Sequence, residues 1–286
     1  MSEGFELIES QQGTDVVVTG DWSPRAEAEL QSGHADGLVL NYARGFRERS
    51  LDFLLGLPVR RLNILARTIK DLHPIYSLSE TLEELQLQTA PTEVRLDLLP
   101  RVLSLGAAWA QIAATIAALP HLRSLLALSY SEPSLDPLAS NRELRTIRMK
   151  DRPAVTTLEG IHQFGTLEHL DLSLAPIGSL SPLMDAAPTI RKLEFESCKH
   201  IHDLRGIERL QALSSINMGD CGELENLHPI SGLQNLAEVY LWGSTIVSDS
   251  DLSPLANLPK LATLRMTSRK SYRPSVAEIK AKIGDL

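Results

Sequence analysis

With 286 residues, a formal net charge of −8 and 43% apolar but only 5% aromatic residues, the chain is acidic and rich in aliphatic side chains. This charge argues against a general nucleic-acid binder, which needs a basic surface, and two cysteines are too few for a disulfide framework. No apolar stretch approaches the ~18 residues of a membrane span, and the start lacks the features of a signal peptide, so we expect a cytoplasmic protein with no membrane contact.

Residues 1–34 are predicted to cap the N-terminal end of the fold. The valine-rich run 15–20 favours a strand, which forms an incomplete first repeat. Ser23 followed by Pro24 is typical of a helix start, because serine caps free amides and proline fits the first turn. We expect a short helix here, with Trp22 beside it covering the open end of the core.

From residue 35 to residue 267 one phrase recurs, in which three apolar residues are separated by two variable residues and then by one. Alternating apolar positions predict half-buried strands, because side chains along a strand point to two faces in turn. We therefore expect about eleven strands, here called rungs, stacked around a shared core. Their apolar triplets are Ala35/Leu38/Leu40, Val59/Leu62/Ile64, Leu82/Leu85/Leu87, Pro100/Leu103/Leu105, Leu122/Leu125/Ala127, Leu144/Ile147/Met149, Leu167/Leu170/Leu172, Ile190/Leu193/Phe195, Leu213/Ile216/Met218, Leu236/Val239/Leu241 and Leu261/Leu264/Met266.

The spacing of the triplets is most regular in the second half of the chain. From Leu144 onward the triplets start 23 residues apart, and only the last step, to Leu261, is 25 residues. At Pro100 the step shrinks to 18 residues, so the register of the rung within residues 88–106 stays open. A fixed period of this length with the pattern L-x-x-L-x-L is the sequence sign of a leucine-rich repeat.

Between rungs the chain must return along the other side of the stack. Proline at the start of a return favours a short helical turn, because it fixes φ and lacks an amide hydrogen. Five returns contain Leu-x-Pro followed by Leu or Ile, and they start at Leu72, Leu135, Leu180, Leu227 and Leu252. The alanine-rich return 107–119 predicts a true α-helix, and residues 268–286 predict a closing cap with an amphipathic helix over 274–283.

The Leu-x-Pro-Leu returns and the period of 22–23 residues resemble the internalin-type leucine-rich repeats of bacteria, and also the repeats of the regulatory subunits of a eukaryotic phosphatase. The resemblance covers residues 35–267 and implies a right-handed α/β solenoid. Its parallel strands would line a concave face, and short helices and 3-10 turns would line the convex face. It also implies that another protein binds the concave face. The chain departs from the family in lacking the asparagine that follows each strand, so buried backbone groups there need water or other backbone groups as partners.

Two cysteines and two histidines form a candidate zinc site, since these are zinc-binding residue types. Cys198 and Cys221, however, are 23 residues apart and occupy the asparagine position of successive repeats. His200 and His202 flank a core residue and should point away from the sulfur atoms. We therefore expect two buried, reduced thiols and no metal.

Candidate binding residues occupy the outward positions of rungs six to eleven. Tyrosine, tryptophan and arginine carry much of the energy of protein interfaces, which favours the aromatic end of this face. Two alternatives stay open: the charged residues could simply pair across strands, and Trp242 could pack for stability into the hollow left by Gly219. The predicted partner-binding residues are Tyr240, Trp242, Arg265, Glu238, Asn217, Glu194, Glu196, Asp171, Arg148 and Lys150.

The sequence contains no nucleophile elbow, phosphate-binding loop or metalloprotease motif, so it predicts neither catalysis nor a cofactor. We expect a non-enzymatic protein–protein interaction module, such as a scaffold, that is monomeric until it binds its partner protein. The alternative is an inhibitor, such as an immunity protein or a regulatory subunit, that blocks a partner enzyme. Co-purification with one partner at stoichiometric yield would distinguish this inhibitor from a scaffold.

Overall fold

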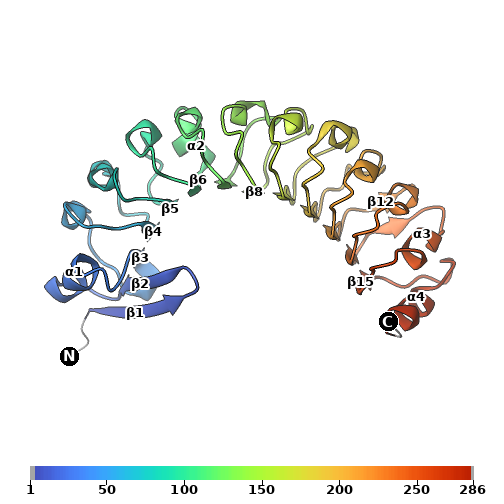
Figure 1. Ribbon diagram of the computed structural model, residues 1–286, viewed down its shortest axis with the longest axis horizontal. Helices are drawn as coiled ribbons and strands as arrows, with labels where there is room; N and C mark the ends of the chain where they lie inside the picture. Colours follow the sequence, from blue (N-terminus) through green and yellow to red (C-terminus); the bar gives the residue numbers. More distant parts are fainter. Residues whose placement is uncertain (1–3, 285–286) are drawn as a thin grey trace. The chain divides into compact units, whose positions relative to one another are not determined.

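The computed structural model describes residues 4–284 and divides the chain into two compact units, Met1–Leu125 and Leu126–Leu286. Residues 1–3 and 285–286 of the two predicted caps lie outside the described residues. Within each unit, strands line one side and short helical segments lie on the other (Figure 1). We call the side of each sheet that faces away from the apolar core its exposed face.

The N-terminal unit begins with an antiparallel hairpin and continues with parallel strands. The strands, in their order in the sheet, are β1 (Phe5–Ser10), β2 (Gly13–Val18), β3 (Gly37–Asn41), β4 (Arg61–Leu65), β5 (Glu84–Gln88) and β6 (Ser104–Ala108), and β7 (Ser124–Leu128) spans the boundary between the units. β2 pairs with β3, which confirms the incomplete first rung. Leu38, Leu62 and Leu85 are neighbours in the register and are buried, because each occupies the middle position of its triplet.

The C-terminal unit repeats the same arrangement, and its strands after β8 are shorter. The strands of this unit are β8 (Thr146–Lys150), β9 (His169–Asp171), β10 (Lys192–Glu194), β11 (Ser215–Asn217), β13 (Glu238–Leu241) and β15 (Thr263–Met266), with a second small sheet of β12 (Glu223–Leu224) and β14 (Ile246–Val247). All of these pairs are parallel. The middle triplet residues from Ile147 to Leu264 are register neighbours and at most 5% exposed, which confirms the triplets of this half.

Short helical turns fill the returns, as the proline pattern predicts. The α-helices are α1 (Pro24–Gln31), α2 (Trp109–Ile112), α3 (Ser253–Ala256) and α4 (Val276–Gly284). The 3-10 segments are Tyr42–Arg44, Asp52–Leu54, His73–Leu78, Leu96–Leu98, Ile116–Ala118, Asp136–Leu138, Ile161–Gln163, Ser181–Asp185, Ile207–Arg209 and His228–Ile230. Ser23 caps α1 by accepting a hydrogen bond from the amide of Ala26, and α4 confirms the expected closing helix with Val276 and Ile279 buried.

The structure corrects the rung at Pro100. β5 pairs with β6 so that Leu85 lies opposite Leu105, and not opposite Leu103 as predicted. The core residues of this rung are therefore Val102, Leu105 and Ala107, all buried, whereas Pro100 is exposed. The predicted triplet was displaced by two residues, because Leu103 and Leu105 fit the leucine pattern while the true last position holds the small residue Ala107.

The α-helix predicted over residues 107–119 is only partly confirmed, because it is much shorter than expected. β6 runs to Ala108, and only the four residues of α2 are α-helical. The buried side chain of Gln111 explains this, because its amide nitrogen donates to the carbonyl oxygens of Ala90 and Thr92 at 3.1 Å each. These hydrogen bonds hold the segment close to the preceding return. The alanine-rich composition therefore does not by itself determine the length of the helix.

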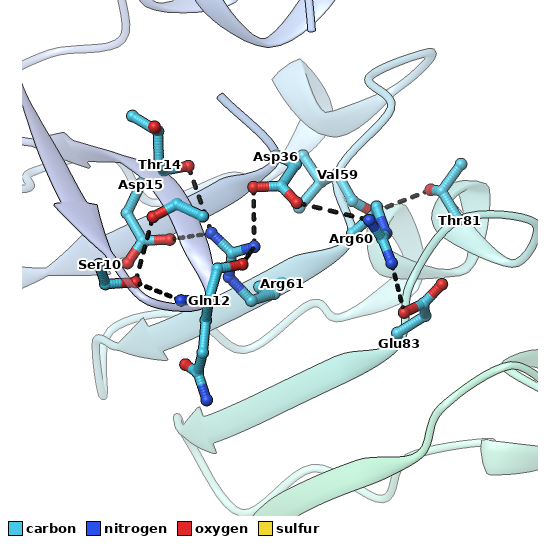
Figure 2. A network of polar contacts seen from close by, with 11 residues as sticks. Ser10, Gln12, Thr14, Asp15, Asp36, Val59, Arg60, Arg61, Thr81 and Glu83 are labelled. Atoms are coloured by element: carbon cyan, nitrogen blue, oxygen red, sulfur yellow. Dashed lines mark hydrogen bonds and ion pairs between the residues drawn. The ribbon is translucent and has the colours of Figure 1, made fainter. Parts of the chain in front are cut away.

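An arginine network joins the N-terminal hairpin to the first repeats (Figure 2). The guanidinium of Arg61 on β4 forms ion pairs of 2.7 Å with both Asp15 and Asp36 and donates to the carbonyl oxygen of Gln12 at 2.7 Å. Gly37 leaves the space for this contact, since a Cβ atom there would lie 1.8 Å from Asp15 Oδ1. The guanidinium therefore connects the turn of the hairpin, β2 and the segment before β3.

The two cysteines are buried and free, as expected, and they occupy the place of the missing asparagines. Cys198 Sγ donates to the carbonyl oxygen of Leu172 at 3.2 Å, and Cys221 Sγ donates to that of Phe195 at 2.9 Å. Burial raises the pKa of Cys198 to about 12 and that of Cys221 to about 11. At these two rungs the thiols thus satisfy backbone groups that we expected to need water or other backbone groups.

The histidines of the zinc alternative lie away from the thiols. His200 and His202 are exposed, whereas both sulfur atoms are enclosed in the core. The ring of His202 contacts the carbonyl oxygen of Glu223, with a distance of 2.8 Å from Nδ1. The arrangement of these four residues therefore favours core packing over zinc binding.

Candidate partner-binding face

A hollow of about 330 Å³ lies on the exposed face of the C-terminal unit, over strands β10, β11, β13 and β15. Seven of the ten predicted site residues line it, together with two that were not selected. The lining residues are Lys192, Glu194, Glu196, Ser215, Asn217, Glu238, Tyr240, Trp242 and Arg265. The structure therefore brings the aromatic and the acidic parts of the predicted site together in one place.

Strand register explains why these side chains meet. Glu194, Asn217, Tyr240 and Arg265 are direct neighbours across four parallel strands, so they form one row on the exposed face. Neighbouring strands lie about 4.8 Å apart, which places consecutive side chains of the row in contact range. Residues two positions earlier or later in each strand form parallel rows, because side chains of the same face recur with a period of two.

The two aromatic side chains in the hollow differ in what they contact. The indole of Trp242 lies directly over Gly219, where a Cβ atom would come within 2.3 Å of its Cε2 atom. Trp242 is therefore half-buried by packing, in agreement with the structural alternative for this residue. Tyr240 is also half-buried, and its neighbours Glu238 and Arg265 are exposed. The hollow thus has an aromatic floor with charged groups at its rim.

Ion pairing fixes the carboxylate of Glu194 at one edge of the hollow. It lies 2.8 Å from Nε2 of His169 and 3.0 Å from Nζ of Lys192. The hydrogen bond from His169, followed by the contributions of Lys192, lowers the pKa of Glu194 to about 2 although burial opposes the shift. The side chain of Glu196 next to it accepts a long hydrogen bond of 3.4 Å from Asn217.

The remaining three predicted residues form a separate ion cluster and do not line the hollow. Asp171 was expected to be exposed, but its side chain is 1% exposed, so this expectation is wrong. One carboxylate oxygen lies 2.5 Å from Nζ of Lys150 and 3.5 Å from Nε of Arg148, and the other accepts from the hydroxyl of Ser173 at 2.8 Å. For these residues the alternative of cross-strand pairing is confirmed.

Metal-binding residue types also meet in this region. One ligand atom each from His169, Asp171 and Glu194 lies within 4.8 Å of the others. Each group already has an ionic partner, since Asp171 faces Lys150 and His169 faces Glu194. A metal ion would have to displace these contacts, so ion pairing accounts for the cluster.

Sequence reasoning did not select Lys192 and Ser215, although both line the hollow. Each lies two residues before a selected residue on the same strand, Lys192 before Glu194 and Ser215 before Asn217. The period-two rule therefore contained the signal that could have found them. The rule assigns Ser215 to the exposed face but does not predict that neighbouring side chains leave it only 7% exposed.

The parallel strands, the short returns and the stacked aliphatic triplets together constitute a leucine-rich-repeat fold, and comparison with known proteins agrees. No protein-family model and no curated protein matches the sequence. Solved structures do match. A leucine-rich-repeat protein of Leptospira interrogans has a TM-score of 0.61 and 17% identity over 86% of this chain. An internalin of Listeria monocytogenes has a TM-score of 0.60 and 16% identity over 91% of this chain and 84% of its own.

A third similar structure is the plant peptide hormone receptor RGFR1 in complex with RGF2, with a TM-score of 0.55 and 13% identity over 91% of this chain. This chain spans 64% of the length of the Leptospira protein and 40% of that of the plant receptor. At these identities the similarity concerns the fold. Among residues 4–284, no helix has both the length and the apolar character needed to cross a membrane.

Proposed function

We propose that this chain is a non-enzymatic protein–protein interaction module whose partner docks on the exposed face of strands β10, β11, β13 and β15. The observation that carries the proposal is the hollow around Tyr240, in which an aromatic floor is bordered by the exposed charges of Glu238 and Arg265. Protein interfaces combine a desolvated aromatic anchor with a polar rim in this way. The plant receptor of similar fold, which is in complex with RGF2, supports the idea that such a fold carries a bound partner.

The electrostatics of the hollow favour a partner with groups of both signs. Glu194 is neutralised by its own neighbours, whereas no ion pair engages Glu196, Glu238 or Arg265 within residues 4–284. Rim charges of this kind govern the association rate and the choice of partner more than affinity. The floor residue Tyr240 is therefore the expected source of binding energy, and Trp242 supports the floor from its position over Gly219.

The proposal is tested by comparing variants of the purified protein as bait in native extract. Tyr240→Ala should weaken binding of a specific partner by at least about 2 kcal/mol, which raises Kd roughly thirtyfold and lowers its recovery. The melting temperature should stay nearly constant. Glu238→Lys should reduce recovery as well, since it reverses a rim charge. Glu159→Lys is the matched control, because Glu159 is equally exposed but lies on a return segment. Full recovery with both hollow variants would show that the partner docks elsewhere.

A further inference from the structure

A second hollow, of about 570 Å³, lies on the N-terminal unit and is lined by cations. Arg67, Thr68, Lys70 and Asp71 come from the segment that follows β4, and Arg49 comes from the segment that follows β3. All five residues are exposed. We propose that this hollow docks a short acidic segment of a partner protein, rich in aspartate or glutamate, independently of the face proposed above.

The cations of the hollow lack a carboxylate partner, unlike four other arginines of this unit. Within residues 4–284, no ion pair or hydrogen bond engages the charged groups of Arg49, Arg67 and Lys70, and the Thr92 hydroxyl donates to the backbone carbonyl of Lys70. In contrast, Arg44 pairs with Glu6, Arg60 with Glu83, Arg61 with Asp15 and Asp36, and Arg95 with Asp97. The hollow therefore gathers guanidinium and ammonium groups that no carboxylate outside the hollow engages, whereas Arg44, Arg60, Arg61 and Arg95 are paired within the chain.

The local charge is opposite in sign to that of the whole chain. Three cations face one carboxylate, Asp71, whose Oδ1 accepts a hydrogen bond from the amide of His73 at 2.9 Å. Like charges gathered in one place repel one another, so the cluster does not stabilise the fold by itself. An incoming carboxylate relieves that repulsion, and a guanidinium can bind it through two parallel hydrogen bonds. Thr68 adds a hydroxyl group at the same site.

The number of cations favours an acidic protein segment over a nucleic acid. A nucleic-acid binder commonly neutralises about 6–10 phosphates to reach useful affinity at physiological salt. Three cations fall short of this, and the net charge of −8 repels a long polyanion. A short peptide with a few carboxylates matches the size and the charge of the hollow without extending over the surrounding acidic surface.

Fluorescence polarisation of a labelled oligoglutamate peptide on the full chain tests this proposal at low ionic strength. The combined variant Arg49→Gln, Arg67→Gln, Lys70→Gln should weaken peptide binding at least about tenfold. The matched control is Arg101→Gln, Arg123→Gln, Arg142→Gln, which removes the same charge from exposed arginines outside the hollow and should leave binding within about twofold. Equal weakening by both, or no binding of the peptide to the unaltered protein, would overturn the proposal.

Two further measurements keep the proposal falsifiable if a variant folds poorly. Asp71→Asn removes the one carboxylate but keeps an oxygen that can accept from the amide of His73, so it should strengthen peptide binding. Damage to the fold cannot produce such a gain, and weaker binding of this variant would contradict the proposal. A single-stranded oligonucleotide of equal charge should bind more weakly than the peptide. Tighter binding that the combined variant abolishes would assign the hollow to nucleic acid and overturn the proposal.

Discussion

Single residues of the C-terminal unit are held by apolar packing beneath the sheet or by ion pairing above it. Leu170 is fully buried between its register neighbours Ile147 and Leu193. Asp171, the next residue, points to the opposite face and is enclosed by Lys150 and Arg148. The pattern along one strand predicts the face on which a side chain lies. It does not predict whether a side chain on the exposed face is shielded from solvent, because long side chains from the neighbouring strands can cover it.

We predict that both Leu170→Ala and Asp171→Ala destabilise the fold. The first leaves a cavity and should cost about 2–5 kcal/mol. The second removes the carboxylate partner of two cations and should cost about 1–3 kcal/mol. An exposed, unpaired aspartate would cost much less. Urea denaturation gives both values, with Glu159→Ala as an exposed control that should stay below about 0.5 kcal/mol. A cost for Asp171→Ala as small as that of the control would contradict the ion cluster.

Glu194 makes part of the stability depend on pH. Its pKa in the folded protein, about 2, lies below the ordinary value of 4.5, so the folded state favours the ionised form. The resulting stabilisation is present above about pH 4.5 and is lost as the pH falls towards 2. The difference in unfolding free energy between the unaltered protein and Glu194→Gln should therefore shrink over this range. A difference that stays constant from pH 6 to pH 2.5 would show that Glu194 is not held as an ion pair.

At the scale of elements, the repeat period predicted most strands and returns because each repeat presents the same apolar triplet to its neighbours. The prediction failed where the triplet is degenerate. The rung of β6 has Val102 and Ala107 as its first and last core residues. Gln111 anchors the return that follows, and its role cannot be predicted from the alanine-rich composition of that return. The hairpin of β1 and β2 was only partly foreseen, because β1 is mostly exposed and carries no apolar triplet.

The attachment of that hairpin depends on Arg61, and this predicts a local effect of mutation. Arg61 is 12% exposed at its side chain and bridges Asp15 and Asp36, so Arg61→Gln leaves two carboxylates without their cation. We expect a loss of about 1–3 kcal/mol, concentrated in β1 and β2. Hydrogen exchange measures this as faster exchange of the amides of these two strands.

Arg60→Gln provides the control for this experiment. Arg60 is 54% exposed, pairs with Glu83 at 2.8 Å and lies 3.7 Å from Asp36, and surface pairs of this kind contribute at most about 1 kcal/mol. Its removal should leave the exchange of β1 and β2 unchanged. If both variants accelerate exchange in the hairpin equally, the network around Arg61 does not hold the hairpin in place.

At the scale of the whole molecule, the repeat pattern explains both the fold and the hollow around Tyr240. The inward positions repeat so strictly that they are readable from the chain alone, whereas the outward positions vary from rung to rung. Seven of the ten predicted site residues line one hollow, because strand register aligns equivalent outward positions. The cationic hollow was not predicted, since its residues come from return segments whose relative placement has no period in the sequence.

The central claim is that the partner protein contacts the hollow around Tyr240, and site-specific photocrosslinking in the native cells tests it most directly. A photoreactive phenylalanine analogue in place of Tyr240 should yield a discrete protein adduct on illumination. The same analogue in place of Met184, which is 50% exposed on a return segment, should yield none. An adduct at position 184 with none at position 240 would contradict the claim.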